Sequence, residues 1–454
     1  MRAPQIWIGL AAAVLVTSIV AVVGQARSVH RVPIVFEAVD LPTAEGASIT
    51  SLAVGPDRRL YGGSIDGRIV RWPIEADGTL SRAHVVRSLV DHAGVERLLL
   101  GLAFDPASTP EEPILWVTHS AYGFAGMDDW TGRVSRLSGP DLTVVQDVVV
   151  GLPRSCRDHA TNGLAFGPDG ALYIAQGSNT AMGAPDPGWC DRPERLLSAS
   201  ILRLDLDLVA EAPLDVKTGE GGAYDPFATG APLTIHASGL RNPYGVLWHT
   251  NGSLYVPING SASGGRSPAG VVGQACGGAG PYPGPTVPGL TGIEARPDLL
   301  ALVEPGRYYG HPNPLRCEFV LDGGNPTPDP DPREVGAYPV GTLPDAAYGE
   351  FAFDFGLHQS PDGIVEYRSP SFGGRMQGAI LVTRYSSGND VIALRPGAES
   401  PEIVRSKTGI PGFEGFQNPL AIAELVPEGI LYVSELQAGK VRMLRPQESG
   451  GSGE

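Results

Sequence analysis

One phrase occurs five times along the chain, and it limits the folds that the chain can adopt. Each copy has an apolar segment, a short turn rich in Pro, Asp, Asn or Gly, and a second segment with an aromatic residue near its start. Such residues accept the backbone angles of tight turns, so each copy predicts a β-hairpin. The copies are SLAVGPDRRLYGGS from Ser51, GLAFDPASTPEEPILWVTHS (interrupted) from Gly101, GLAFGPDGALYIAQGS from Gly163, GVLWHTNGSLYVPINGS from Gly245 and AIAELVPEGILYVSE from Ala421.

A third strand follows most of these hairpins, with the copies GRIVRW from Gly67, RVSRL from Arg133, SILRLD from Ser200 and KVRML from Lys440. A further unit, GAILVTRYSSGNDVIALRP from Gly378, lacks the turn phrase but keeps this ending. Sheets of three or four strands that repeat in this way are typical of a β-propeller. The constant position of the turn argues against a β-sandwich with coincidental hairpins. We therefore predict an all-β fold, a six-bladed β-propeller with long loop insertions.

The predicted propeller is one domain, residues 32–446, followed by a flexible tail, residues 447–454. Residues 32–41 (VPIVFEAVDL) are strand-like and can complete the sheet of the last blade. A Gly/Pro-rich stretch, residues 263–344, separates the fourth and fifth units, and we predict that it is an insertion and not part of a blade. Such loops gather on the face that binds ligands. The 61 Gly and 42 Pro residues interrupt nearly every window long enough for a helix, which excludes a helical bundle.

The chain is acidic and has no basic block, because 33 Lys and Arg against 49 Asp and Glu give a formal net charge of -16. Such a surface repels phosphate backbones, so nucleic acid is not an expected partner. Residues 1–26 read as an export signal, with Arg2, an apolar run and a small-residue exit at Ala26. The run is also long enough to span a bilayer, so an N-terminal membrane anchor is the alternative and the one membrane contact expected. In both cases we expect the body of the protein outside the cytoplasm, whether periplasmic, secreted or anchored facing outward.

Four cysteines, Cys156, Cys190, Cys276 and Cys317, follow this leader. An even number in an exported chain indicates two disulfides, for which three connectivities exist. The order of the cysteines favours Cys156–Cys190 and Cys276–Cys317, each of which closes a long loop-like insertion. No CxxC pair occurs, which argues against a zinc or redox site.

The sequence contains no HExxH, Walker, EF-hand or GxSxG motif, which argues against zincin, nucleotide-hydrolase and lipase functions. Polar residues stand instead just before the first strands of three units: His159 in CRDHATNGLAF, Arg241-Asn242 in SGLRNPYG, and Asn418 in QNPL. Equivalent loops of different blades reach the central channel, so we expect these side chains to converge on one axial site. His can exchange a proton near neutral pH, and Arg offers a planar fork for a carboxylate.

Two further segments stand close to the repeated units. They are YYGHPNP from Tyr308, towards the end of the insertion, and SPDGIVEY from Ser360. We expect both to be loops that shape the rim of the ligand-binding face. The alternative for each is a purely structural role.

With His159, Arg241 and Asn242 in these places, the chain resembles the soluble quinoprotein glucose/sorbosone dehydrogenase family. The resemblance extends from about Glu45 to Leu444. It implies an exported six-bladed propeller that holds pyrroloquinoline quinone (PQQ), with calcium, over the central channel. It also implies oxidation of a small-molecule sugar or related alcohol, with an external electron acceptor.

The resemblance implies roles for individual residues as well. His159 is the expected general base that removes a hydroxyl proton, and Arg241 is the expected cation that stabilises the negative charge of the reduced quinone. The cofactor contacts implied in this way are Arg241, Asn242, Arg384 and Asn418, and the calcium contacts are the backbone around Gly260 and Ser261.

Three places depart from the family pattern. Ser178 stands where the family usually has an Asp that orients the catalytic His, and residues 416–421 contain no arginine where the family clamps the quinone carboxylates. Arg384 is the nearest substitute for a family lysine. Two other functions therefore stay open. One is a non-catalytic propeller that binds carbohydrate or a protein partner. The other is a metal-dependent, lactonase-like hydrolase, which needs several acidic and Asn ligands on the axis, where the sequence offers only Asn162, Asn242 and Asn418.

Overall fold

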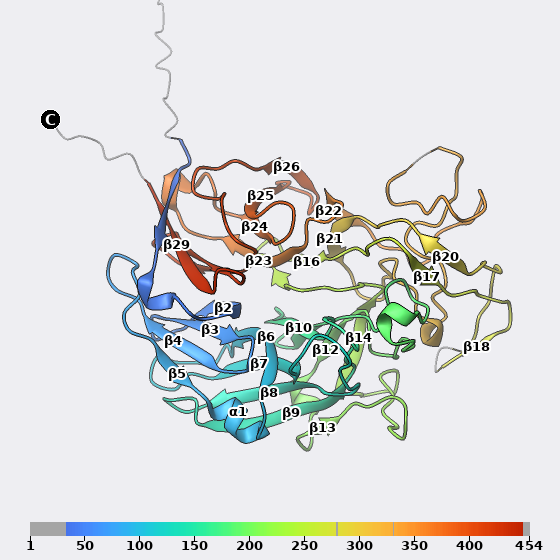
Figure 1. Ribbon diagram of the computed structural model, residues 1–454, viewed down its shortest axis with the longest axis horizontal. Helices are drawn as coiled ribbons and strands as arrows, with labels where there is room; N and C mark the ends of the chain where they lie inside the picture. The colour runs from blue at the N-terminus through green and yellow to red at the C-terminus, as the bar shows by residue number, and fades with distance from the viewer. Residues whose placement is uncertain (1–32, 278–279, 330, 448–454) are drawn as a thin grey trace, which may run out of the picture. The chain divides into compact units, whose positions relative to one another are not determined.

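The computed structural model describes residues 33–277, 280–329 and 331–447 (Figure 1). The export signal or anchor predicted for residues 1–26 lies outside these residues, and so do residues 448–454 of the predicted tail. The described residues from Ile34 to Gln447 belong to one compact unit. Within the described part of the chain, no helix is long and apolar enough to cross a membrane.

Six sheets, antiparallel except for one edge strand, form the blades. The strands of each blade are named from the innermost outwards. Blade one contains β2 (Ile49–Val54), β3 (Arg59–Ser64), β4 (Ile69–Pro73) and β5 (His84–Val86), and blade two contains β6 (Arg97–Phe104), β7 (Leu115–Ala121), β8 (Gly132–Ser138) and β9 (Val144–Leu152), with β13 (Leu214–Asp215) at its edge. Blade three contains β10 (Thr161–Phe166), β11 (Leu172–Gln176), β12 (Ser200–Leu204) and β14 (Leu233–Ser238).

Blades four to six follow the same order. Blade four contains β15 (Leu247–Trp248), β16 (Leu254–Ile258), β21 (Asp298–Val303) and β22 (Phe351–Gly356). Blade five contains β23 (Pro361–Tyr367), β24 (Ala379–Arg384), β25 (Asp390–Pro396) and β26 (Ile403–Lys407). Blade six contains β27 (Pro419–Leu425), β28 (Ile430–Glu435), β29 (Lys440–Pro446) and β1 (Phe36–Asp40). Outside the blades lie α1 (Ser88–Ala93), the short strands β17 (Gly265–Ser267), β18 (Ala275–Cys276), β19 (Gly280–Pro281) and β20 (Leu290–Ile293), and the 3-10 helices η1 (Pro42–Ala44), η2 (Pro187–Trp189), η3 (Leu206–Leu208), η4 (Pro314–Arg316) and η5 (Ser371–Gly374).

The ring closes through the first strand of the chain. β1 pairs antiparallel with β29, with Phe36 opposite Pro446, so the last blade combines strands from both ends of the domain. The first strands of successive blades contact one another all the way round, from β2 through β27 and back to β2. The predicted six-bladed β-propeller is therefore confirmed, and the closing strand predicted within residues 32–41 is β1, Phe36–Asp40.

Apolar side chains fill each of the six junctions between neighbouring blades. Both faces of a blade are thus covered, and strands such as β11 and β28 are buried along their whole length. This is why these strands read as continuous apolar runs in the sequence. Burial of this apolar surface supplies the main stabilisation of the ring.

Two segments differ from the sequence-based expectation. The stretch 263–344 was expected to lie outside the blades, but β21 within it is the third strand of blade four. The prediction was wrong there because surrounding Gly and Pro residues hid the short apolar run DLLALV. Likewise SPDGIVEY is mostly not a loop, since Pro361–Tyr367 forms β23, the first strand of blade five.

Both expected disulfides are present, Cys156–Cys190 and Cys276–Cys317. The second closes the insertion, where Cys276 packs in a buried apolar cluster with Tyr282 and Phe319. The first joins two loops of blade three beside the axis of the ring.

Candidate functional site

A cavity of about 560 Å³ lies where the first strands of the blades begin. Every blade supplies at least one lining residue from its first strand or from the segment leading into that strand. These residues include Thr50, Leu98, Asn162, Tyr244, Asp362 and Leu420. Because the first strands surround the axis of the ring, the cavity lies on that axis.

Four of the residues predicted for the site line this cavity: His159, Arg241, Asn242 and Gly260. His159 lies in the loop that leads into β10, and Arg241 and Asn242 lie in the equivalent loop before β15. The structure therefore brings the equivalent loops of blades three and four to one site.

Three other predicted residues lie outside this lining: Ser261, Arg384 and Asn418. Ser261 is buried beside a smaller neighbouring cavity. The Nε of Arg384 donates to Oδ1 of Asp390 at 2.7 Å, and the Nδ2 of Asn418 donates to the carbonyl of Tyr385 at 2.9 Å. Since Tyr385 lines the cavity, Asn418 stands one layer behind it. The cofactor roles of Arg384 and Asn418 stay predictions.

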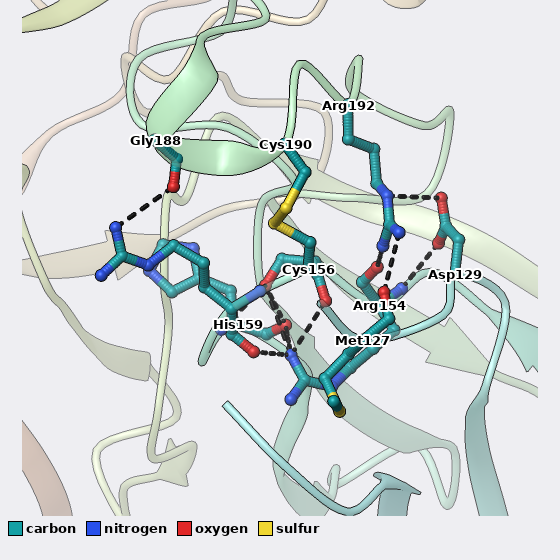
Figure 2. The surroundings of a disulfide bond; sticks show 10 residues. Met127, Asp129, Arg154, Cys156, His159, Gly188, Cys190 and Arg192 are labelled. Carbon is teal, nitrogen blue, oxygen red and sulfur yellow. Dashed lines mark hydrogen bonds and ion pairs between the residues drawn. A yellow bond between two sulfur atoms is a disulfide. The ribbon is translucent and has the colours of Figure 1, made fainter. Parts of the chain in front are cut away.

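The loop that carries His159 folds around the buried side chain of Arg154 (Figure 2). Nη1 of Arg154 donates to the carbonyl oxygens of His159 at 2.7 Å and Ser155 at 3.2 Å, and also to that of Arg157. Its Nη2 donates to the carbonyl of Gly123 at 2.7 Å. Charge-assisted hydrogen bonds of this kind are strong and directional, so they fix the backbone of the loop and thereby the position from which the His159 side chain extends.

The hydrogen bonds of Ser178 determine which nitrogen of His159 is basic. Its hydroxyl donates its one hydrogen to the carbonyl of Thr180 at 2.8 Å, and Nδ1 of His159 lies 2.9 Å from the same oxygen. Because that hydrogen is already used, Nδ1 must donate and the Ser178 oxygen must accept. The neutral imidazole then has its lone pair on Nε2, for which no described residue provides a hydrogen bond. Nε2 is therefore the nitrogen that can take a proton from a ligand.

The charges around the site favour a neutral base next to a fixed cation. Burial holds the pKa of His159 well below its ordinary value of 6.5, and the positive charge of Arg241 lowers it further. Burial also lowers the pKa of Arg241, to about 10, so this guanidinium stays charged at pH 7. At neutral pH the site thus combines an uncharged imidazole with a buried positive charge.

Backbone carbonyls hold the guanidinium of Arg241 in place. Its Nε donates to the carbonyl of Ala181 at 2.8 Å, and its Nη1 donates to the carbonyls of Gly260 at 2.8 Å and Asn259 at 3.2 Å. Its Nη2 makes no hydrogen bond with the residues that the structure describes. One nitrogen of a rigidly held cation thus stays available to a ligand.

Asn242 lies against the neighbouring blade. Its Oδ1 accepts a hydrogen bond from Nδ2 of Asn162 at 3.0 Å, which leaves its Nδ2 without a partner among the described residues. The backbone of Gly177 passes between the two loops, and a Cβ there would lie 2.9 Å from Oδ1 of Asn242 and 2.9 Å from Cβ of His159. Glycine therefore permits the close approach of the loops that carry these two side chains.

Asp362 also lines the cavity, although it was not among the predicted site residues. It occupies in β23 the place that Asn162 occupies in β10, so an alignment of TNGLAF with PDGIVEY could have found it. Its Oδ1 accepts a hydrogen bond from Nδ2 of Asn259 at 2.8 Å. Burial raises the pKa of Asp362 to about 8, against the opposing effect of that hydrogen bond. The cavity therefore contains a carboxyl group that is mostly uncharged at pH 7.

We expect Asp362→Asn to stabilise the protein at pH 8 and to change its stability little near pH 4. In the unfolded chain this carboxyl ionises near its ordinary pKa of 3.8, whereas in the fold it stays protonated up to about pH 8. The wild type therefore loses stability as the pH rises from 4 to 8, and the variant lacks this contribution. Melting temperatures of both proteins across this range test the prediction. Glu111→Gln, at an exposed position, is the control. Melting temperatures of wild type and Asp362→Asn that change in parallel with pH would contradict the prediction.

The segment YYGHPNP is buried and does not shape the rim of the cavity. Nε2 of His311 lies 2.9 Å from Oε1 of Glu194, and both side chains are buried. Burial alone would raise the pKa of Glu194, but the charge of His311 and the hydrogen bonds from Ser198 and Thr180 outweigh it and bring the value to about 2. Glu194 was not predicted from the sequence, because no pattern around it indicates that it is buried.

No family model matches the sequence, and no curated protein matches it. Solved structures do resemble it. The PQQ-bound form of aldose sugar dehydrogenase from Streptomyces coelicolor has 17% sequence identity and a TM-score of 0.55, over 91% of this chain and 99% of that chain. The holo form of the PQQ domain of pyranose dehydrogenase from Coprinopsis cinerea has 13% identity and a TM-score of 0.57, over 90% and 97%.

A third structure, an oxidoreductase described as a glucose dehydrogenase from Thermus thermophilus, has 21% identity and a TM-score of 0.54, over 91% of this chain and 100% of that chain. At these identities the likeness concerns the fold, and it covers almost the whole chain. The protein therefore shares the six-bladed propeller fold of structures that include a PQQ-bound aldose sugar dehydrogenase and a glucose dehydrogenase.

Proposed function

We propose that the protein is an extracytoplasmic, PQQ-dependent dehydrogenase that oxidises a sugar or a related alcohol and passes the electrons to an external acceptor. One observation carries the proposal: on the axis of the ring, an uncharged imidazole with a free Nε2 shares a cavity with the buried cation Arg241. The two disulfides support a location outside the cytoplasm, where such bonds persist.

The donors in the cavity fit a planar, anionic quinone. Nη2 of Arg241 and Nδ2 of Asn242 have no partner among the described residues, and both side chains line the cavity. Arg157 adds a second positive charge to the lining, which also includes Asp158 and Asp186. Asp362 is mostly uncharged at pH 7, so it repels an anion only weakly. PQQ bound here would accept a hydride from the substrate.

His159 and Arg241 have separate roles in the proposed reaction. Nε2 of His159 is placed to take the proton of the substrate hydroxyl, and bound PQQ would supply the acceptor for the hydride from the carbon that carries this hydroxyl. The pKa of His159 is low, so its base form is present throughout the neutral range. Arg241 is held by carbonyls before any charge develops, and this preorganisation lets it stabilise a growing negative charge without rearranging.

Calcium is proposed at the backbone around Gly260 and Ser261. The hydroxyl oxygen of Ser261 is buried and has no hydrogen-bond partner within the described part of the chain, so it is free to coordinate a cation. The carbonyl of Gly260 accepts from Arg241, and its second lone pair stays open. The same described residues contain no group of three or more His, Cys, Asp or Glu placed to hold a metal ion.

Reconstitution tests the proposal. Purified protein is titrated with PQQ in the presence of calcium or of excess EGTA, and dye reduction is measured with a panel of aldoses and acyclic alcohols. We expect a change in quinone absorbance, weaker uptake with EGTA, and turnover of at least one aldose. No binding of PQQ at micromolar concentration would refute the proposal. Binding of sugars without PQQ uptake would favour the carbohydrate-binding alternative, and hydrolysis of lactones would favour the hydrolase.

Ser178→Ala is expected to lower kcat about fivefold and to change KM little, because a net hydrogen bond of roughly 1 kcal/mol that selects the basic nitrogen is lost. Steady-state kinetics of the reconstituted protein measure this effect. Ser387→Ala, at an exposed position outside the cavity lining, is the control. An unchanged kcat in Ser178→Ala would show that the imidazole does not depend on Ser178 for its orientation.

A further inference from the structure

Two loops of blade three meet beside the cavity, and Figure 2 shows the contacts between them. The first loop carries Cys156 and His159, and the second, between β11 and β12, carries η2 and Cys190. A disulfide and two hydrogen bonds join the loops: Cys156–Cys190, the bond from Nη1 of Arg157 to the carbonyl of Gly188 at 3.2 Å, and the bond from Nη1 of Arg192 to the carbonyl of Arg154 at 2.6 Å. Nη2 of Arg192 also donates to the carbonyl of Met127, in the loop between β7 and β8, at 2.7 Å.

Trp189 stands between these contacts, next to Cys190 in the chain. Its ring centroid lies 4.5 Å from that of His159, with an angle of 55° between the ring planes. The guanidinium carbon of Arg241 lies 5.7 Å from the indole centroid, and that of Arg157 lies 5.6 Å from it. One indole thus contacts the proposed base and two cations, which are attracted to its π face.

The burial of Trp189 indicates what the ring does. The residue lines the cavity but is only 8% exposed, because it also packs in the buried cluster of the insertion. Little ring surface is left for a ligand to stack on, so the ring acts mainly through its neighbours. Its contacts cover parts of His159 and Arg241 that water would otherwise reach.

We propose that Trp189 is a positioning residue. Its indole fixes the orientation of the His159 imidazole and the Arg241 guanidinium and shields both from water, and the Cys156–Cys190 disulfide in turn fixes the position of the indole. This inference rests on the proposed function, because it concerns the base and the cation of that reaction. It assigns the disulfide a role in the geometry of the site beyond stability.

The proposal has a consequence for the titration of His159. Arg241, His311 and Glu194 act electrostatically on the imidazole, and four further titratable or charged residues line the same cavity: Arg157, Asp158, Asp186 and Asp362. Substitution of Trp189 leaves all of these charges in place and admits water. Since burial is the main reason for the low pKa of His159, removal of the ring will raise that pKa towards its ordinary value.

Histidine NMR of the purified protein without cofactor tests this consequence. The imidazole of His159 is identified by the signal that His159→Gln removes, and it is titrated in wild type, Trp189→Phe and Trp189→Ala. We expect titration at a higher pH in Trp189→Ala and at an intermediate pH in Trp189→Phe, which keeps an aromatic ring. The double variant Cys156→Ala/Cys190→Ala should shift in the same direction.

Two matched controls separate positioning from general destabilisation. Trp130→Ala removes an indole that also contacts two cations, Arg195 and Lys217, outside the cavity lining. Cys276→Ala/Cys317→Ala removes the other disulfide. Both should leave the titration of His159 unchanged.

In the reconstituted protein, kcat should fall about tenfold in Trp189→Ala, with partial rescue in Trp189→Phe. An unchanged titration of His159 in every Trp189 variant that folds, and in the Cys156/Cys190 variant, would overturn the inference. If wild type takes up no PQQ, the proposed function fails, while the titration still decides whether Trp189 and the disulfide set the environment of His159. If Trp189→Ala does not fold, Trp189→Phe and the disulfide variant decide the question.

Discussion

His159→Gln is expected to lower kcat by about 10³-fold, because among the described residues His159 is the one histidine that lines the cavity, and its Nε2 is free to accept a proton. Glutamine keeps a polar side chain of similar size but cannot take a proton. PQQ uptake should change little, since Arg241 and Asn242 supply the unpaired donors. Dye-reduction kinetics and absorbance titration, on the same preparation, measure the two effects separately.

The control for this substitution is His92→Gln, at the end of α1 and outside the cavity lining.

The dependence of kcat/KM on pH provides an independent test. A base with a depressed pKa is protonated, and so inactive, only at low pH, and the acid limb of kcat/KM in wild type should therefore lie below pH 6.5. Turnover by His159→Gln within threefold of wild type, or an acid limb above pH 6.5, would show that another group is the base.

Glu194→Ala is expected to lower the free energy of unfolding by about 3–5 kcal/mol, because it leaves several buried donors without an acceptor. Glu194 accepts hydrogen bonds from the backbone N–H groups of Asn179 at 3.0 Å and Thr180 at 2.9 Å, and from the hydroxyl of Thr180 at 2.6 Å. It also contacts Ser198 and pairs with His311. One carboxylate thus joins the loop after β11 to the segment YYGHPNP.

Urea denaturation measures this loss, with Glu220→Ala as the control, since that side chain is more than half exposed and its ion pair with Arg195 contributes little. The sign of the pH dependence follows from the depressed pKa of Glu194. Its contribution is complete above about pH 4.5 and is lost as the pH falls towards 2. Glu194→Gln should show a weaker acid dependence than wild type. A loss below 1 kcal/mol in Glu194→Ala would contradict the prediction.

The fold could be predicted because its signal is local and repeated. Each hairpin places its turn residues and apolar runs within a short window, so the phrase at Gly163 reveals β10 and β11 without knowledge of distant contacts. β21 was missed because a single strand, separated from its blade by an insertion, carries no repeated context. The pairing of Cys156 with Cys190 was favoured by order alone, and the structure confirms it.

The site could be predicted only where it follows the repeat. His159 and Arg241 stand at equivalent places before their strands, and that shared register indicates a common location. Trp189 and Glu194 lie in a long irregular loop whose path depends on contacts with Cys156 and His311. No short-range pattern specifies such contacts, so their place in the site becomes visible only in the structure.

The pairing of β1 with β29 has a consequence for the order of folding. Residues about 400 positions apart must meet before the ring is closed, which gives this contact a very high contact order and a large cost in chain entropy. Five blades can form in sequence as the chain emerges, but the sixth must wait for the last strand. Until then the apolar faces of blades one and five that pack against blade six are exposed, so the nearly complete chain is the species most prone to aggregate.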